Sequence, residues 1–288
     1  MAAVVFACLS ALLFGALTVA IRIALPRVNG AEVAALASAA VALGVTVVIA
    51  VLTIPSDRHF QVADLWPFLA AGVLAPGLSQ LFFVQAVRDI GASRTSVLVG
   101  CAPLVSVVIA LIALHEPLRT LLIVGAVLIV VGSLALAGER VRPAEFRSLG
   151  MLFALASTVM FSTRDNFLRW LAVGAKPPAL VTAPVAMAGG AVTLFAYLLL
   201  RRAELRGLRR ALRVFLVPGL LFGVSYSLLF EAYYRGRVTV VSPLVASESL
   251  WGVVFASLLL RRSELISRHV VVGAVLVVAG GAVIGATR

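Results

Sequence analysis

The stretch from Val238 to Glu264 reads VTVVSPLVASESLWGVVFASLLLRRSE, an apolar run with one carboxylate, Glu248, near its middle. A helix of about 20 apolar residues is long enough to cross the hydrocarbon core of a bilayer. If this run crosses a membrane, Glu248 lies near the midplane, where an ionisable side chain costs roughly 2.5 to 3.5 kcal/mol on insertion scales. Such a side chain usually faces a partner or a watery cavity, so Glu248 is a candidate functional residue. The alternative is a structural hydrogen-bond or ion-pair partner between helices.

The composition of the whole chain agrees with a membrane location. Of the 288 residues, 62% are hydrophobic and 12% are charged, and the mean hydropathy is +1.13. Soluble domains are about half apolar and a quarter charged. The apolar runs are also too long and too uniform for the alternating strands of a membrane barrel. The sequence therefore predicts an all-α, polytopic membrane protein.

Apolar runs recur along the chain and predict ten transmembrane helices. Because no basic residue precedes the first run, we expect it to be a membrane span and not a cleaved signal. Prolines and glycines mark the short turns between the runs. The predicted spans are 2–24, 31–53, 66–87, 92–114, 119–137, 149–171, 178–200, 213–234, 238–260 and 269–286.

The positive charges predict an orientation for these spans. Taken alternately, the linkers on one side of the membrane carry 16 Lys and Arg residues, and those on the other side carry 7. The positive-inside rule then predicts that both termini lie on the non-cytoplasmic side of a bacterial-type inner membrane. The linker Arg201–Arg213, RRAELRGLRRALR, is expected to lie against anionic headgroups. Because the arginines stand at the ends of apolar runs, the net charge of +12 does not indicate a nucleic-acid partner.

The two halves of the chain are similar in sequence, which predicts repeats at 1–142 and 143–288. Each repeat holds five spans, an odd number, so the second is inserted upside down relative to the first. Secondary transporters often consist of two inverted repeats with the substrate held between them near the midplane. Matching residues in the two halves are Ser10, Phe14 and Arg22 with Ser157, Phe161 and Arg169; Ala86 and Leu104 with Ala232 and Leu250; and Glu116, Gly125, Ala126, Leu128 and Gly132 with Glu264, Gly273, Ala274, Leu276 and Gly280.

The chain resembles the EamA-type transporters of the drug/metabolite transporter superfamily. In that family each half contains a proline-bearing span, then G-E-R-L-S and a glycine-bearing last span. Here His115-Glu116-Pro117-Leu118 and Ser263-Glu264-Leu265-Ile266-Ser267 stand at the G-E-R-L-S position, with His115 in place of Gly and Ser249 in place of the proline that Pro103 supplies. The resemblance implies gradient-driven transport of a small polar metabolite, with export of amino acids or related compounds expected. The alternatives are a lipid-carrier flippase of the same fold, a non-transporting membrane scaffold or an intramembrane enzyme.

Polar residues in the sixth span suggest where a substrate binds. The segment from Ser157 to Asn166 contains Arg164 and Asp165, whereas the matching part of the first span is nearly apolar. Arg164 can bind a carboxylate or phosphate through its planar guanidinium group, and Glu248 can carry a coupling proton. We expect Arg164 to pair with Glu248, because consecutive helical residues such as Arg164 and Asp165 point about 100° apart. The alternative is a static ion pair that joins two helices.

Further residues complete the predicted substrate site. Ser157 and Phe161 share a helix face with Arg164, Trp251 follows Glu248 by one turn, and Tyr226, Gln80 and Gln85 can hydrogen-bond a ligand. Each of these residues has the alternative role of packing or bonding to a neighbouring helix. No HExxH, cysteine-cluster or phosphate-loop motif occurs, so we expect no metal, no cofactor and no direct ATP coupling. The glycine-rich edge spans are candidates for contacts in a homodimer.

Overall fold

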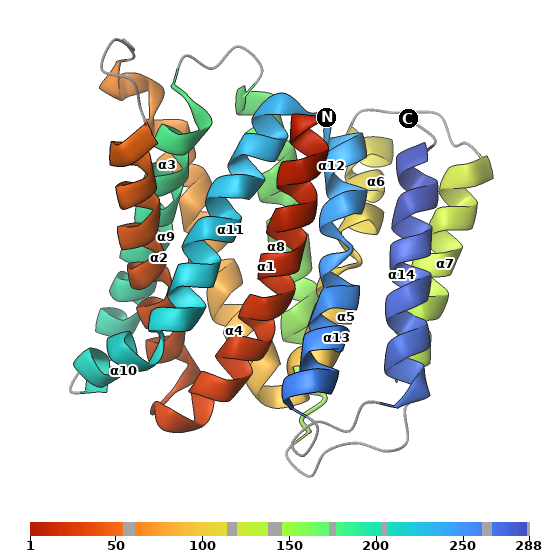
Figure 1. Cartoon of the computed structure of the whole chain (residues 1–288), viewed down its shortest axis with the longest axis horizontal. Coiled ribbons are helices and arrows are strands. Elements are labelled where there is room, and N and C mark those ends of the chain that lie inside the picture. The colour runs from red at the N-terminus through yellow and green to blue at the C-terminus, as the bar shows by residue number, and fades with distance from the viewer. Residues whose placement is uncertain are drawn as a thin grey trace.

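The computed structural model describes residues 1–53, 61–113, 120–137, 146–172, 177–202, 207–260 and 267–286. In these ranges every regular element is a helix (Figure 1). The motif residues 115–118 and 263–266 lie outside them. The elements are α1 (Ala2–Ala24), η1 (Leu25–Arg27), α2 (Ala31–Thr53), η2 (Val62–Asp64), α3 (Trp66–Gly72), η3 (Val73–Leu78), α4 (Ser79–Ile90), α5 (Ala92–Val99), α6 (Ala102–Ala113), α7 (Thr120–Ala137), α8 (Leu149–Ala172), α9 (Ala179–Leu200), α10 (Leu208–Val214), α11 (Leu216–Arg235), α12 (Val238–Val245), α13 (Glu248–Leu259) and α14 (Arg268–Ala286).

Among the described residues, six helical segments are long and apolar enough to cross a membrane. They are Ala2–Arg27, Ala31–Thr53, Val62–Ile90, Ala179–Leu200, Leu216–Arg235 and Val240–Leu259. Three further apolar helices, in α5–α6, α7 and α14, are shorter. α8 has 24 residues but carries Arg164, Asp165 and Arg169. The protein is therefore a multi-pass membrane protein, and ten crossings remain a prediction.

Most predicted spans coincide with single helices. Spans 2–24 and 31–53 match α1 and α2, and five others match α7, α8, α9, α11 and α14 to within three residues. The remaining three are interrupted. Span 66–87 consists of α3, the π-helical η3 and α4; span 92–114 consists of α5 and α6; and span 238–260 consists of α12 and α13. Pro76 lies in η3 and Pro243 in α12, where proline removes a backbone donor.

The two repeats run in opposite directions through the bundle. Arg22, near the end of α1, donates from Nη1 to the Arg88 carbonyl oxygen at 2.9 Å, near the end of α4. The backbone N–H of Arg147, just before α8, donates to the Asp89 carbonyl oxygen at 2.9 Å. The end of α1 and the beginning of α8 therefore lie at the same end of the bundle. Both chain termini lie at the opposite end (Figure 1).

The last helices of the two repeats, α7 and α14, pack against each other at one edge of the bundle (Figure 1). Gly125 lies against Gly280 and Ile284, whereas Gly132 lies against Gly273, so the two helices are antiparallel. A Cβ atom on Gly280 would lie 2.6 Å from the Gly125 carbonyl oxygen. The glycines therefore permit a close backbone approach, as small residues do in membrane helix pairs.

We expect Gly280→Val to separate α7 from α14 and to lower the thermal unfolding midpoint in detergent. Overpacking a tight contact costs on the order of 1–3 kcal/mol. The matched control is Gly44→Ala in α2, because an added Cβ there meets no atom within 4 Å. Equal midpoints for the two variants would show that the glycine contact is unimportant for stability.

Two of the interrupted helices break at matching positions in the repeats. α5 ends before Gly100 and α6 begins at Ala102, while α12 ends before Ala246 and α13 begins at Glu248. The broken helices cross at small residues, since Gly252 of α13 contacts Ser96 of α5. Both breaks therefore lie near one another inside the bundle.

Candidate functional site

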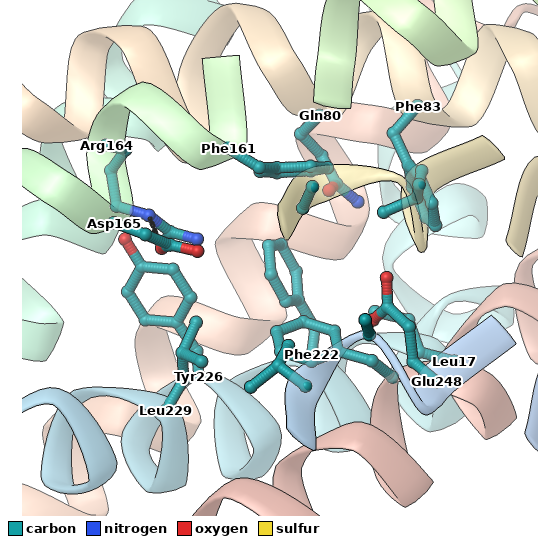
Figure 2. A pocket seen from close by; sticks show the side chains of 15 residues that line it. Leu17, Gln80, Phe83, Phe161, Arg164, Asp165, Phe222, Tyr226, Leu229 and Glu248 are labelled. Atoms are coloured by element: carbon teal, nitrogen blue, oxygen red, sulfur yellow. Dashed lines mark ion pairs between the residues drawn. The ribbon is translucent and has the colours of Figure 1, made fainter. Parts of the chain in front are cut away.

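A cavity lies where the two helix breaks approach each other (Figure 2). Val99 and Ala102 line it from the α5–α6 break, and Val245, Ala246 and Glu248 line it from the α12–α13 break. The volume open to water centres is about 50 Å³. One water needs roughly 10–15 Å³ on this measure, so the cavity holds a few waters.

The cavity lining follows the internal repeat. Most lining residues occur as pairs, one from each repeat, separated by 147 residues on α1 and α8 and by 146 residues elsewhere. The site therefore lies between the two repeats, on the axis that relates them. The pairs are Phe14 with Phe161, Leu17 with Arg164, Gln80 with Tyr226, Phe83 with Leu229, Val99 with Val245, and Ala102 with Glu248.

All the charged side chains of the lining belong to the second repeat. Arg164 stands opposite Leu17 in the repeat alignment, Asp165 opposite Thr18, and Glu248 opposite Ala102. Arg164 is 3% exposed and Asp165 is 7% exposed, so both are held away from bulk water. Burying charge is costly unless it is paired. The shared scaffold thus encloses a site whose charge is asymmetric.

Arg164 pairs with Asp165, which corrects the prediction that it pairs with Glu248. Arg164 Nε lies 2.8 Å from Asp165 Oδ1, in a contact without hydrogen-bond geometry. The hydroxyl of Tyr233 donates to Asp165 Oδ2 at 3.0 Å and fixes this carboxylate. The long Arg164 side chain bends back to its neighbour, so the 100° between consecutive residues does not prevent the contact.

Two aromatic rings surround the Arg164 guanidinium. Its Cζ lies 5.1 Å from the ring centroid of Tyr226 and 5.8 Å from that of Phe161. Such cation–π contacts contribute about 0.5–2 kcal/mol each, with more when the cation is desolvated. Nη1 of Arg164 is buried and has no hydrogen-bond partner among the described residues. The guanidinium is therefore positioned, and it retains capacity to bind an anionic group.

Glu248 lies across the cavity from the Arg164–Asp165 pair (Figure 2). It is the first residue of α13, and the amino end of a helix favours a negative charge. Within the described ranges, no hydrogen bond or ion pair reaches its carboxylate. Glu248 is thus the one charged group of this lining that has no ion-pair partner in the described chain.

Of the eight predicted site residues, five line the cavity: Gln80, Phe161, Arg164, Tyr226 and Glu248. Nε2 of Gln80 is buried and unpaired among the described residues, whereas the Tyr226 hydroxyl donates to the Ala75 carbonyl oxygen at 3.3 Å. The roles of these residues in substrate binding remain predictions.

The structure places the other three predicted residues, Ser157, Gln85 and Trp251, outside this cavity. Ser157 lies two turns before Arg164, and its hydroxyl donates to the Ala154 carbonyl oxygen at 2.8 Å. Gln85 follows Gln80 by five residues, which turns it about 140° around the helix. Trp251 is 37% exposed and stacks on Phe255 at 6.0 Å.

The sequence interpretation missed Asp165 and nine apolar residues of the lining, five of them in the first repeat. Applying the repeat to the predicted residues Phe161, Arg164 and Glu248 would have found three of these, Phe14, Leu17 and Ala102. Phe83 and Val99 match Leu229 and Val245, which were not predicted either. In the described residues no group of three His, Cys, Asp or Glu side chains could hold a metal ion.

Matching arginines join helices at the two ends of the bundle. Arg22 of α1 donates from Nη1 to the Arg88 carbonyl oxygen at 2.9 Å, near the end of α4. Arg169 of α8 donates from Nη1 to the Tyr233 carbonyl oxygen at 3.0 Å, near the end of α11. A residue offset of 147 relates Arg22 to Arg169. Each repeat therefore contributes one equivalent connection, and the two lie at opposite ends.

Comparison with known proteins identifies the family. A solved structure described only as the crystal structure of a protein has a TM-score of 0.69 and 19% sequence identity, covering 98% of this chain and 95% of that chain. At this identity the likeness shows the fold alone. A search of curated proteins finds no match. The profile of the EamA-like transporter family matches residues 1–138 and again residues 148–286, which confirms the resemblance seen in the sequence. The chain belongs to the EamA-like transporter family, a family of membrane transporters.

Proposed function

We propose that this protein is a gradient-driven secondary transporter with ten membrane spans that exports a small polar metabolite, an amino acid or a related compound. The observation that carries the proposal is the charged cavity between two oppositely directed repeats, at the point where two helices break. Binding sites near the midplane, at broken helices between inverted repeats, are a common plan of secondary transporters. The repeats 1–142 and 143–288 are the two moving halves in this proposal.

The lining offers separate positions for the carboxylate, the amine and the apolar side chain of a transported substrate. Arg164 binds a carboxylate through its free N–H groups, and Glu248 accepts hydrogen bonds from an amine across the cavity. Phe14, Phe83 and Phe161 provide an apolar wall between them. An amino acid with an apolar side chain has all three parts.

The charges of the lining suggest how transport is coupled to protons. Arg164, Asp165 and Glu248 together carry one negative charge when all three are ionised. An amine and a proton therefore compete for the Glu248 carboxylate. Binding of an entering proton would release the amine, and binding of the amine would release the proton. This exchange is what export driven by a proton gradient requires.

The cavity must widen to load such a passenger, because about 50 Å³ accommodates only a few waters. The breaks at Gly100–Cys101 and Ala246–Ser247 divide two helices into halves that can tilt separately. We assign the Arg22 and Arg169 connections as the closures of the two ends, one for each repeat.

The closures make a directional prediction. We expect Arg169→Ala to open the cavity toward the end that bears the termini, and Arg22→Ala to open it toward the opposite end. Losing a charge-assisted hydrogen bond of about 1.5–3 kcal/mol shifts a two-state population by roughly tenfold or more. An Ala102→Cys probe in the cavity, labelled in vesicles of either orientation, measures the shift.

Each variant is the control for the other in this labelling experiment. The native cysteines, exposed Cys8 and buried Cys101, are first replaced by Ser and Ala. If both variants increase labelling from the same side, the two arginines do not close opposite ends.

Uptake by proteoliposomes tests transport itself. We expect at least one solute in a panel of amino acids, sugars and amines to accumulate only when a pH gradient is imposed. Empty liposomes and gradient-free proteoliposomes provide the baseline. If all uptake is independent of the gradient, proton-driven transport is wrong.

We also propose an inner-membrane location with both termini outside the cytoplasm. The described arginine-rich segments, including α10 and the Arg147 region, lie at the end of the bundle opposite the termini (Figure 1). The positive-inside rule supports placing that end in the cytoplasm.

A further inference from the structure

A second cavity lies at the arginine-rich end of the bundle, away from the central site. It is enclosed by the segment from Arg27 to Val33, the end of α9 and the beginning of α10. The volume open to water centres is about 370 Å³, which is several times the about 50 Å³ of the central cavity. None of its lining residues lines the central cavity.

This second cavity has an apolar floor and a basic rim. Val33 of α2, Leu198 of α9 and Ala211 of α10 are buried beneath it. Arg27 and Arg210, which are far apart in sequence, both belong to the lining. Both are exposed, and no hydrogen bond or ion pair within the described residues occupies either guanidinium. The second cavity is therefore lined by two guanidinium groups that have no partner among the described residues.

The position of α10 places this cavity at the membrane surface. Leu208 and Leu212 pack on the hydrophobic core, whereas Arg209, Arg210 and Arg213 lie on the other side of the helix. A short helix with one apolar and one basic face is typical of a segment lying in the interface of a bilayer. Lipid headgroups therefore have direct access to the cavity.

We propose that this cavity binds the phosphate group of an anionic lipid, with Arg27 and Arg210 as its ligands. Arginine binds phosphate with paired N–H donors, and basic pockets between helices at the cytoplasmic surface suit anionic headgroups. Glu32 and Asn29 also belong to the lining. The Glu32 carboxylate repels a bare anion but accepts hydrogen bonds from hydroxyl groups. This arrangement favours a headgroup that carries hydroxyls beside its phosphate, as phosphatidylglycerol does.

Native mass spectrometry of the full chain, titrated with phosphatidylglycerol in detergent, tests the site. We expect Arg210→Ala and Arg27→Ala each to weaken binding by about fivefold. The matched control is Arg209→Ala, because Arg209 neighbours Arg210 on α10 but does not line the cavity. Glu32→Gln is expected to strengthen binding of lipids that lack headgroup hydroxyls, such as phosphatidic acid.

Competition with soluble phosphate compounds tests whether the bound phosphate group belongs to a lipid. Glycerol 3-phosphate and inorganic phosphate, added at millimolar concentration, are expected to displace little of the bound lipid, because they lack the acyl chains that reach the apolar floor. Full displacement by either soluble phosphate would overturn the lipid assignment. Equal weakening by Arg209→Ala and Arg210→Ala would reduce the effect to general surface charge and overturn the cavity as a site. Neither result depends on transport, so the proposed function is tested separately.

Discussion

Glu248→Gln is expected to abolish the dependence of transport on a pH gradient while leaving the fold intact. Glutamine has nearly the shape of glutamate but cannot release a proton. Because no described residue pairs with the carboxylate, the substitution breaks no ion pair, and a stability change within about 1 kcal/mol is expected. The measurement is solute accumulation in proteoliposomes with and without the gradient, together with the thermal unfolding midpoint.

A second carboxylate gives the matched control for this experiment. Glu231 lies near the end of α11, where its Oε2 is 2.6 Å from Arg235 Nε, and it does not line the central cavity. Glu231→Gln should therefore leave the pH dependence unchanged. Unaltered proton coupling in Glu248→Gln would remove Glu248 from its proposed role, whatever the control shows.

Removing Arg164 alone is expected to destabilise the protein strongly. Arg164→Leu leaves the Asp165 carboxylate buried without its cation, and breaking a buried pair in this way costs about 3–5 kcal/mol. The double variant Arg164→Leu/Asp165→Thr installs the residues that Leu17 and Thr18 provide at the matching positions of the first repeat. Replacing both partners by a smaller, less polar pair should restore most of the lost stability.

Transport by the double variant then isolates the second role of Arg164. With the fold restored, binding of a carboxylate-bearing passenger should remain lost, because the cavity no longer contains a cation. Thermal unfolding of both variants and substrate-induced stabilisation of the double variant provide the two measurements. Normal affinity for anionic solutes in the double variant would exclude Arg164 from the site, and a double variant as unstable as the single one would contradict the ion-pair account.

The helices were largely predictable from hydropathy, but their interruptions were not. An apolar run of about 20 residues must form backbone hydrogen bonds internally in lipid, so its limits follow from composition. A break inside such a run leaves the hydropathy unchanged, because it lies within the protein and not in lipid. Gly100, Pro103 and Pro243 were the available signals, but the repeat does not strengthen them, because Ala246, Ser249 and Val97 stand at the matching positions.

The candidate site was predictable in its charges and less so in its contacts. Arg164 and Glu248 were found because ionised groups are rare in apolar runs. The prediction that they pair with each other was wrong, because the sequences of separate spans do not specify which helices face each other. The Tyr233 hydroxyl that fixes Asp165, 68 residues away, is a tertiary contact that no local pattern contains. The apolar lining was missed because a phenylalanine in a membrane helix carries no signal of facing a cavity.

Accessibility of position 102 tests the central claim most directly, because it requires no knowledge of the passenger. Ala102 occupies the position of Glu248 in the first repeat and lines the cavity at the α5–α6 break. With the native cysteines replaced, a membrane-impermeant thiol reagent is applied to Ala102→Cys in right-side-out and inside-out vesicles. The account predicts labelling from both faces of the membrane, with a pH gradient changing the ratio between them. Labelling from neither face, or from one face under every condition, would contradict a carrier whose central cavity opens alternately to the two sides.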